Sequence, residues 1–374
     1  PNVTFDYTYS DDYGSKFQTA MAAGTGVPDL FWSEAWMVQL YGSQGALLET
    51  TDVIERNIDN LIPAKAAEAY VPQMEGYFGM PGDLSPSGIY YRKDLLDEMG
   101  IEIPTDMMYM PDFIDILTRI AAEGKNAVLY PSGGTFVAAA YWSWFNAQFG
   151  GSGPASCDNQ EVTLNNEAGV QAVELIKAIY DTGATLTADF WTAEYWNALN
   201  TDQLVLDLSP AWARGFWEEN LLPEKQGMWQ LAPLPRAVEG GPRTGIWGGA
   251  TLISPASTEN PELVKLFMEF AFASMEGATA AGDWGIIPPY IPYLETTFQE
   301  EPTALFGDQN IGAVWLELAQ EISPDFCRTA VYAAATDEFL TPAIDSMVTG
   351  GADIQATLDE VAAQVEEVLP DYQA

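Results

Sequence analysis

Residues 248–270, GGATLISPASTENPELVKLFMEF, contain a strand pattern that is followed after a short loop by a helix pattern. Thr251–Ile253 is a short apolar run that ends at Ser254, which predicts a strand. Asn260 followed by Pro261 predicts a helix start, because asparagine caps helices and proline is tolerated at the first helical position. The apolar residues that recur at helical spacing, and that we expect to be buried, are Leu263, Leu266, Phe267 and Phe270.

Strand and helix patterns alternate in both directions from this stretch. Alternating apolar residues predict a strand over 3–9, and 204–208 reads as another short strand. Helices are expected around Phe17, over 167–182 and over 354–368. Repeated alternation of this kind is typical of α/β architecture, and we expect parallel sheets.

Length and charge limit what the chain can be. It has 374 residues, more than the ~250–300 at which single cores stop growing, so we expect two domains. Its 54 acidic and 14 basic residues give a formal charge of −40, which excludes nucleic acid as a partner and disfavours anionic ligands. Two interpretations of this acidity stay open: an acidic secreted protein, or a protein from a saline habitat.

The chain has no histidine and two cysteines, Cys157 and Cys327. Without histidine, neither Ser-His-Asp catalysis nor a His-ligated zinc site is available, and we expect no metal and no cofactor. The cysteines form either one disulfide or two buried thiols. The longest apolar run, 136–145, is shorter than the ~18–20 residues of a membrane span, and no signal peptide is expected in the sequence.

Several short motifs, in a fixed order, resemble bacterial extracellular solute-binding proteins of sugar importers, the maltose-binding-protein class. The motifs are AGTGVPDL (23–30), GALLE (45–49), YFGMP (77–81), IYYRKDL (89–95), APLP (232–235), GGATLIS (248–254), NPE (260–262) and GIIP (285–288). The family's helix start is altered at 104–109, and its first strand and helix are expected to be missing.

The resemblance implies two α/β lobes linked by hinge strands, with the ligand in a cleft between them. Lobe one would comprise 1–108 and 252–306, and lobe two 109–251 and 307–374. Thr251, which adjoins the second segment of lobe one, is expected to share that lobe with Tyr91. The implied function is non-enzymatic: the extracytoplasmic component of an ABC importer, binding a disaccharide or oligosaccharide by lobe closure. The implied partners are the sugar and a membrane permease. The protein would be a monomer, either periplasmic or anchored at the outer face of the membrane.

A sugar needs aromatic rings for its flat C–H faces and polar groups for its hydroxyls. Twelve tryptophans and seventeen tyrosines make such a site plausible in this chain. The candidate ligand-binding residues are Trp32, Glu34, Trp36, Asp83, Ser85, Tyr141, Trp142, Trp212, Trp247, Gly248, Trp284, Arg328 and Tyr332. Trp212 is the strongest stacking candidate, because it follows the 204–208 strand where the resemblance places a tryptophan.

Structural roles remain open for some of these residues. Tyr141 and Trp142 belong to an aromatic-rich helix that suits a core, and Ser85 fits an ordinary turn. Arg328 would bind sugar oxygens or pair with a carboxylate. Two other functions also remain open: a binding protein for a cation such as a polyamine, and a glycoside hydrolase, which needs two carboxyl groups ~5–10 Å apart.

Overall fold

The computed structural model describes residues 4–8, 13–130, 136–283, 285–299 and 303–373. Its α-helices are α1 (Tyr13–Ala23), α2 (Ala35–Ser43), α3 (Thr51–Asn57), α4 (Pro63–Glu68), α5 (Lys93–Glu98), α6 (Met110–Ala122), α7 (Phe136–Gln148), α8 (Glu167–Asp181), α9 (Ala193–Asn200), α10 (Ala213–Asn220), α11 (Pro261–Phe272), α12 (Met275–Asp283), α13 (Ile291–Leu294), α14 (Ile311–Gln320), α15 (Thr341–Val348) and α16 (Ile354–Val368). Its strands are β1 (Phe31–Ser33), β2 (Tyr70–Val71), β3 (Gly76–Tyr77), β4 (Met80–Pro81), β5 (Ser87–Arg92), β6 (Asn126–Ala127), β7 (Leu204–Pro210), β8 (Trp229–Ala232) and β9 (Thr251–Ile253).

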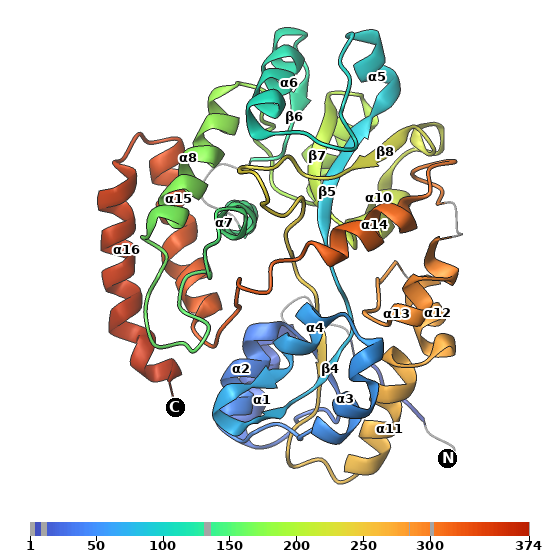
Figure 1. The fold of residues 1–374 in the computed structure, drawn as a ribbon, viewed down its shortest axis with the longest axis vertical. Helices are drawn as coiled ribbons and strands as arrows, with labels where there is room; N and C mark the ends of the chain where they lie inside the picture. The colour runs from blue at the N-terminus through green and yellow to red at the C-terminus, as the bar shows by residue number, and fades with distance from the viewer. Residues whose placement is uncertain (1–3, 9–12, 131–135, 284, 300–302, 374) are drawn as a thin grey trace.

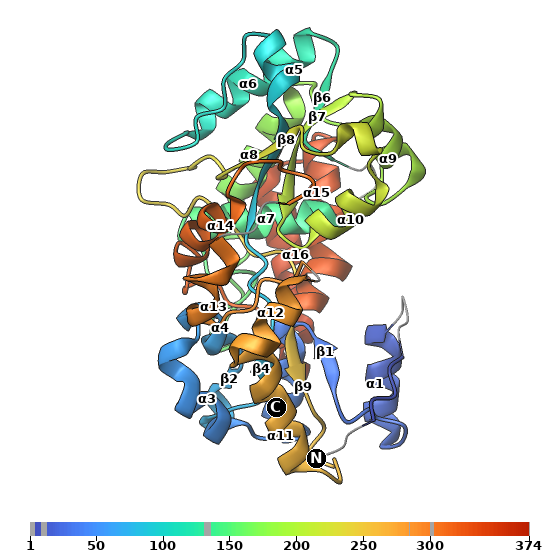
Figure 2. The ribbon, with the colours of Figure 1, turned by 90° about the vertical axis from the view of Figure 1, so that its right-hand side faces the viewer.

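Figures 1 and 2 show two lobes, which we call the small and the large lobe. The small lobe, at the bottom of both views, contains α1 to α4, β1 to β4, β9 and α11. Its three-stranded sheet has the order β1-β9-β4, with Leu252 of β9 opposite both Trp32 and Met80. Apolar side chains such as Val53 and Met268 form a core under this sheet.

The large lobe is built on a four-stranded sheet with the order β6-β7-β5-β8. All six residues of β5 are buried. Tyr91 pairs with Leu206 of β7 and with Gln230 of β8, whereas Thr251 lies in the small-lobe sheet. The prediction that Tyr91 and Thr251 share a lobe is therefore wrong, because the buried strand β5 finds its hydrogen-bonding partners in the large lobe.

Strand directions also differ from the prediction. Among the named strands of the described chain, β6 and β7 pair in parallel, and all other pairs are antiparallel. The strand expected over 3–9 is not formed within residues 4–8, which have no regular structure. Phe5 and Tyr7 are 58% and 82% exposed there, so burial gives this segment no reason to form a strand.

The predicted helices are present. The helix expected over 354–368 is α16, and its apolar residues Leu358, Val361 and Val365 are buried. In α11, however, Leu266 and Phe270 are 50% and 46% exposed, so the predicted face is wrong for them. Its buried residues are Val264, Met268 and Phe272. Helix α11 is apolar around most of its surface, and the sheet beside it selects the stripe that is buried.

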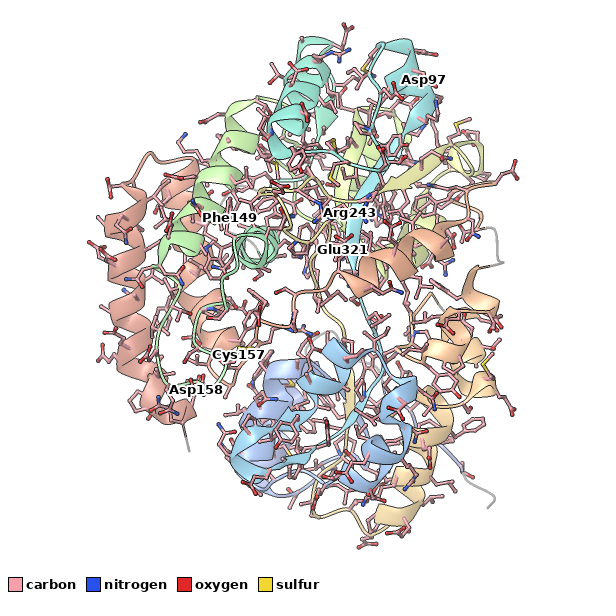
Figure 3. All side chains as sticks on the ribbon, in the orientation of Figure 1. Asp97, Phe149, Cys157, Asp158, Arg243 and Glu321 are labelled. Atoms are coloured by element: carbon pink, nitrogen blue, oxygen red, sulfur yellow. A yellow bond between two sulfur atoms is a disulfide. The ribbon has the colours of Figure 1, made fainter. Side chains whose placement is uncertain are left out.

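Cys157 and Cys327 form a disulfide with 5.2 Å between their Cα atoms, which confirms one of the two predicted alternatives. Both belong to the large lobe, and Figure 3 shows Cys157 on the loop that follows α7. The amide of Cys327 also donates to the carbonyl of Ser152 at 3.0 Å. The chain on either side of Cys327 is thereby fixed against the large lobe.

An ion cluster fixes the segment that leads from the large lobe toward β9. Arg243 donates from Nε to Glu321 Oε1 at 2.9 Å and from Nη1 to the carbonyl of Asp106 at 2.9 Å. Figure 3 shows Arg243 and Glu321 close together near the centre of the molecule. Arg236 adds a second contact to Glu321 at 3.3 Å. No helix in the described ranges is long and apolar enough to cross a membrane.

Candidate ligand-binding site

Arg328 connects the two lobes. Its Nη1 lies 3.2 Å from Glu34 Oε2, and its Nη2 lies 2.8 Å from Glu68 Oε1. Glu34 directly precedes α2 and Glu68 ends α4, so both carboxylates belong to the small lobe. Arg328 follows the disulfide-bonded Cys327 and is 8% exposed. The guanidinium therefore links the lobes through two carboxylates that lie largely out of water.

Lys65 supports this network from α4. It is fully buried, and its Nζ contacts Glu68 and the carbonyl of Gly249, the latter at 2.8 Å. Burial lowers the pKa of Lys65, and the charge of Glu68 partly offsets that effect. Burial alone would raise the pKa of Glu68, but the charges of Arg328 and Lys65 outweigh it and hold that pKa below its ordinary value. Glu68 therefore carries the negative charge that pairs both cations.

Glu34 and Asp83 have the opposite electrostatic behaviour. Burial raises the pKa of the Glu34 carboxyl, although Arg328 opposes the shift. Burial also raises the pKa of Asp83, against a hydrogen bond from Ser85. Asp83 Oδ2 accepts that bond from Ser85 Oγ at 2.5 Å, and Oδ1 accepts from the amide of Ile287 at 3.4 Å. Asp83 thus holds the turn between β4 and β5 against the loop at Ile287.

Gly248 and Gly249 lie at the centre of these groups. Their φ angles are 78° and 83°, in the left-handed region that favours glycine. A Cβ on Gly248 would lie 3.1 Å from Trp212 Nε1 and 3.9 Å from Ser85 Oγ. A Cβ on Gly249 would lie 3.0 Å from Lys65 Nζ. The two glycines let the crossing chain pass between the charged groups of the small lobe and the aromatic groups of the large lobe.

Trp212 lies on the large-lobe side of these glycines. It lies just after β7, separated from it by Ala211, and is the N-cap residue of α10. Its Nε1 donates to the carbonyl of Trp247 at 2.6 Å, and the two ring centroids are 6.0 Å apart at 71°. Trp247 stacks on Phe190 with centroids 5.2 Å apart. Both tryptophans are only partly buried, so ring surface remains available beside the glycines.

Two predicted residues lie on β1 and α2 of the small lobe. The ring of Trp32 packs against Phe272, with centroids 5.4 Å apart, and passes beneath Gly82. A Cβ on Gly82 would lie 2.4 Å from Trp32 Cη2. Trp36 packs at the edge of the cluster that contains Phe17 and Val38. Both rings are partly exposed, and both support the small-lobe core.

Two predicted residues are core residues. Tyr141 and Trp142 are 1% and 0% exposed on α7. Tyr141 donates to the carbonyl of Leu129 at 3.0 Å, and Trp142 Nε1 donates to the carbonyl of Gly169 at 3.1 Å. A ligand has no access to them, so their prediction as binding residues is wrong. The physical reason is the position of α7 in the large lobe, where it is buried around most of its circumference.

Tyr332 and Trp284 complete the predicted set. The hydroxyl of Tyr332 lies 2.9 Å from Ser143 Oγ, and its ring is 6.3 Å from that of Phe326. It is partly exposed on the segment that follows Arg328. Trp284 lies outside the described residues. The structure therefore gathers six of the predicted residues around the glycine pair, of which Gly248 was itself predicted: Glu34, Asp83, Ser85, Trp212, Trp247 and Arg328.

Sequence reasoning missed other residues at the same place. Lys65 and Glu68 are three residues apart on α4, a spacing that puts both on one helix face and was a readable signal. Arg214 lies in the first turn of α10 and approaches Gly285, where a Cβ would be 3.3 Å from its Nη2. For the guanidinium of Arg214, the described part of the chain provides neither an ion pair nor a hydrogen bond.

Comparisons with known proteins show the family of this chain. A family model described as bacterial extracellular solute-binding protein matches residues 1–278. An arabinooligosaccharide-binding protein of Halalkalibacterium halodurans is 25% identical over 328 residues, which is 84% of this chain and 70% of that protein. A second arabinooligosaccharide-binding protein, from Bacillus subtilis, is 24% identical over 283 residues, covering 74% of this chain and 62% of that protein.

Solved structures share the fold. The galacto-N-biose-/lacto-N-biose I-binding protein of Bifidobacterium longum superposes with a TM-score of 0.79 at 19% identity, over 98% of this chain and 88% of its own. A binding protein of B. animalis subsp. lactis in complex with β-1,6-galactobiose gives 0.81 at 18% identity, over 96% and 89%. The match of the family model over most of the chain shows the family: this chain belongs to the bacterial extracellular solute-binding proteins.

Proposed function

We propose that this chain is the ligand-binding component of an ABC importer and that its ligand is a disaccharide or an oligosaccharide. The family is one of extracellular solute-binding proteins. The relatives named above bind arabino-oligosaccharides, and the solved structures include complexes with lacto-N-biose and β-1,6-galactobiose. These different sugars have in common flat C–H faces and many hydroxyl groups.

The observation that carries the proposal is the composition of the junction around Gly248. Trp212 and Trp247 approach Gly248 from the large lobe. On the small-lobe side, Arg328 donates hydrogen bonds both to Glu34 and to the carbonyl of Gly248. A ligand between these groups would contact both lobes at once. When the two lobes close, the ligand gains contacts that the open protein does not offer. Ligand binding therefore favours the closed form, and the closed form indicates that the site is occupied.

The charges at the junction favour an uncharged ligand. Arg328 is paired with Glu34 and Glu68, and Lys65 is paired with Glu68. A polyamine would meet two cations that are already in place, and it would have to displace one of them from a buried ion pair. Neutral hydroxyls need only donors and acceptors, which the Glu34 carboxyl and the Arg214 guanidinium supply. We assign ring stacking to Trp212 and Trp247.

The proposed setting follows from the same family. We place the protein outside the cytoplasm, either in a periplasm or anchored at the outer face of the cell membrane, where the Cys157–Cys327 disulfide is stable. We propose that it acts as a monomer that delivers its ligand to a membrane permease. We place its chain crossings near residues 82–87, between β4 and β5, and near residues 245–250, between β8 and β9. In each case the two strands belong to different sheets.

A thermal-shift screen tests the proposal. The panel is arabinobiose, arabinotriose, arabinotetraose, lactose, lacto-N-biose, β-1,6-galactobiose and maltose, with spermidine as the cationic control. A sugar at about 100 times its Kd adds about 2.7 kcal/mol to the free energy of unfolding, which gives a clear shift. Titration calorimetry then confirms a single site. A shift with spermidine alone, or with no member of the panel, would contradict carbohydrate binding.

A further inference from the structure

Exposed aromatic rings extend from Trp212 along the large lobe, away from the glycine pair. Trp191 lies 5.9 Å from Trp212 and 4.7 Å from Phe216, measured between ring centroids. Trp196 stacks on Trp191 at 5.1 Å and 27°. Figure 2 shows the helices that flank these residues, α9 and α10, on one side of the large lobe, with α10 nearer the small lobe. We call Trp191, Trp212 and Phe216 the aromatic ledge.

The ledge covers the core with only part of its surface. Trp191 and Trp212 pack against the hydrophobic core and stay partly exposed, whereas Tyr195 and Phe190 below them are 0% and 8% exposed. Phe216 is 49% exposed, and Trp191 and Trp212 are partly exposed. Large aromatic rings that stay in contact with water in a continuous group are typical of a binding surface.

Trp191 is held in a backbone conformation that is unfavourable for its side chain. Its φ is 65°, in the left-handed region, where a bulky residue costs on the order of 1–3 kcal/mol. Its carbonyl accepts a hydrogen bond from Trp196 Nε1 at 3.1 Å, and its ring lies between Trp196 and Phe216. The surrounding contacts therefore fix the ring at the surface despite the backbone cost. Such strain is concentrated at functional sites.

We propose that the outer part of the aromatic ledge, Trp191 with Phe216, is a second binding subsite, on which Trp191 stacks a further sugar unit of an oligosaccharide whose first units lie on Trp212 and Trp247. This inference rests on the proposed carbohydrate function and narrows it to chains longer than a disaccharide. The rings of Trp191 and Trp212 are adjacent and tilted by 49°. Successive sugar rings also change orientation at each glycosidic bond, so neighbouring units would each find a stacking surface.

The test is the dependence of affinity on chain length in Trp191→Gly. Glycine removes the ring and suits φ 65°, so the backbone is not strained by the change. Titration calorimetry compares arabinobiose with arabinotetraose, or lactose with its tetrasaccharide homologue if only lactose binds. In the unchanged protein the tetrasaccharide should bind more tightly. In Trp191→Gly its Kd should rise about tenfold, while the Kd of the disaccharide changes less than about twofold.

A matched control separates ring loss at the ledge from ring loss elsewhere. Phe270→Ala removes a ring that is 46% exposed on α11 of the small lobe, and it should leave both affinities unchanged. If Trp191→Gly weakens both sugars equally or neither, the subsite is contradicted while the proposed function stands. If the unchanged protein binds no sugar of the whole panel, the proposed function fails and the subsite fails with it.

Discussion

Arg328 of the large lobe donates a hydrogen bond to Glu34 of the small lobe, with 3.2 Å between Nη1 and Oε2. The same guanidinium holds Glu68 and the carbonyls of Gly248 and Gly249. In a chain with 14 basic residues against 54 acidic ones, Arg328 and Lys65 are both placed in one buried network at the junction. The junction is therefore held by charge pairing as well as by chain connectivity.

Arg328→Gln should lower the free energy of unfolding by on the order of 3 kcal/mol. The substitution leaves Glu34 and Glu68, both partly buried, with one cation fewer, and a carboxylate that is poorly solvated and unpaired is costly. Urea denaturation followed by circular dichroism measures the change. Arg56→Gln is the control, because its pair with Glu269 is more exposed and should contribute less than about 1 kcal/mol. Equal losses in the two variants would show that the Arg328 network adds no special stability.

Trp212→Ala should weaken binding of the identified sugar about tenfold or more, because it removes a stacking ring and also the hydrogen bond that positions Trp247. Trp212→Phe keeps a ring without the Nε1 donor, and it should have an intermediate affinity. Titration calorimetry gives both values, and circular dichroism checks that each variant is folded. An unchanged affinity in a folded Trp212→Ala protein would remove Trp212 from the site.

Asp207 should make stability depend on pH. It is fully buried, and burial raises its pKa from 3.8 to about 7, although the amide of Leu129 and the hydroxyl of Tyr195 both donate to it. A raised folded-state pKa means that the folded protein binds this proton more tightly. The contribution of Asp207 to stability is therefore fully present below pH about 4 and is lost as the pH rises to about 7.

Asp207→Asn isolates this effect. The amide keeps an acceptor for the Leu129 amide and does not ionise, so the variant should gain stability relative to the unchanged protein as the pH rises from 5 to 8. The difference between their urea midpoints across that range is the readout. Asp97→Asn, which removes an exposed carboxylate (Figure 3), should show no such trend. A constant difference between Asp207→Asn and the unchanged protein would mean that Asp207 does not titrate in this range.

The disulfide should stabilise both the fold and the position of Arg328. Cys157 and Cys327 are 170 residues apart in sequence, so the bond closes a long loop in the unfolded chain. Replacing both by serine should cost about 2–4 kcal/mol of unfolding free energy. Sugar affinity should also fall, because Arg328 adjoins residue 327, which the disulfide no longer holds against the loop at residue 157. Identical unfolding midpoints for the double variant and the oxidised protein would contradict the stabilising role.

The sequence predicted the local elements better than their partners. The stripe of α16 and the strand over Thr251–Ile253 were readable because each pattern is determined by its own residues. The assignment of β5 to a lobe was not readable, since a fully buried strand looks the same in either sheet. The face of α11 was misjudged for a similar reason: Leu266 and Val264 are both apolar, and only the neighbouring sheet distinguishes them.

The candidate site was predictable where position along the chain determines it. Trp212 follows the strand β7 and Gly248 precedes the strand β9, so the strand pattern in the sequence located both residues. Tyr141 was misassigned because aromatic content alone does not separate a core helix from a binding surface. Trp191 was missed because its importance comes from a φ of 65°, which no residue type reveals.

A crystal structure of the complex with the tightest-binding sugar of the panel tests the central claim most directly. We predict that the sugar lies at the Gly248–Gly249 crossing, with one ring stacked on Trp212 or Trp247 and a hydroxyl bonded to a small-lobe side chain such as Glu34. A sugar bound to one lobe only, or at a distance from these residues, would contradict the claim that closure of the two lobes creates the site.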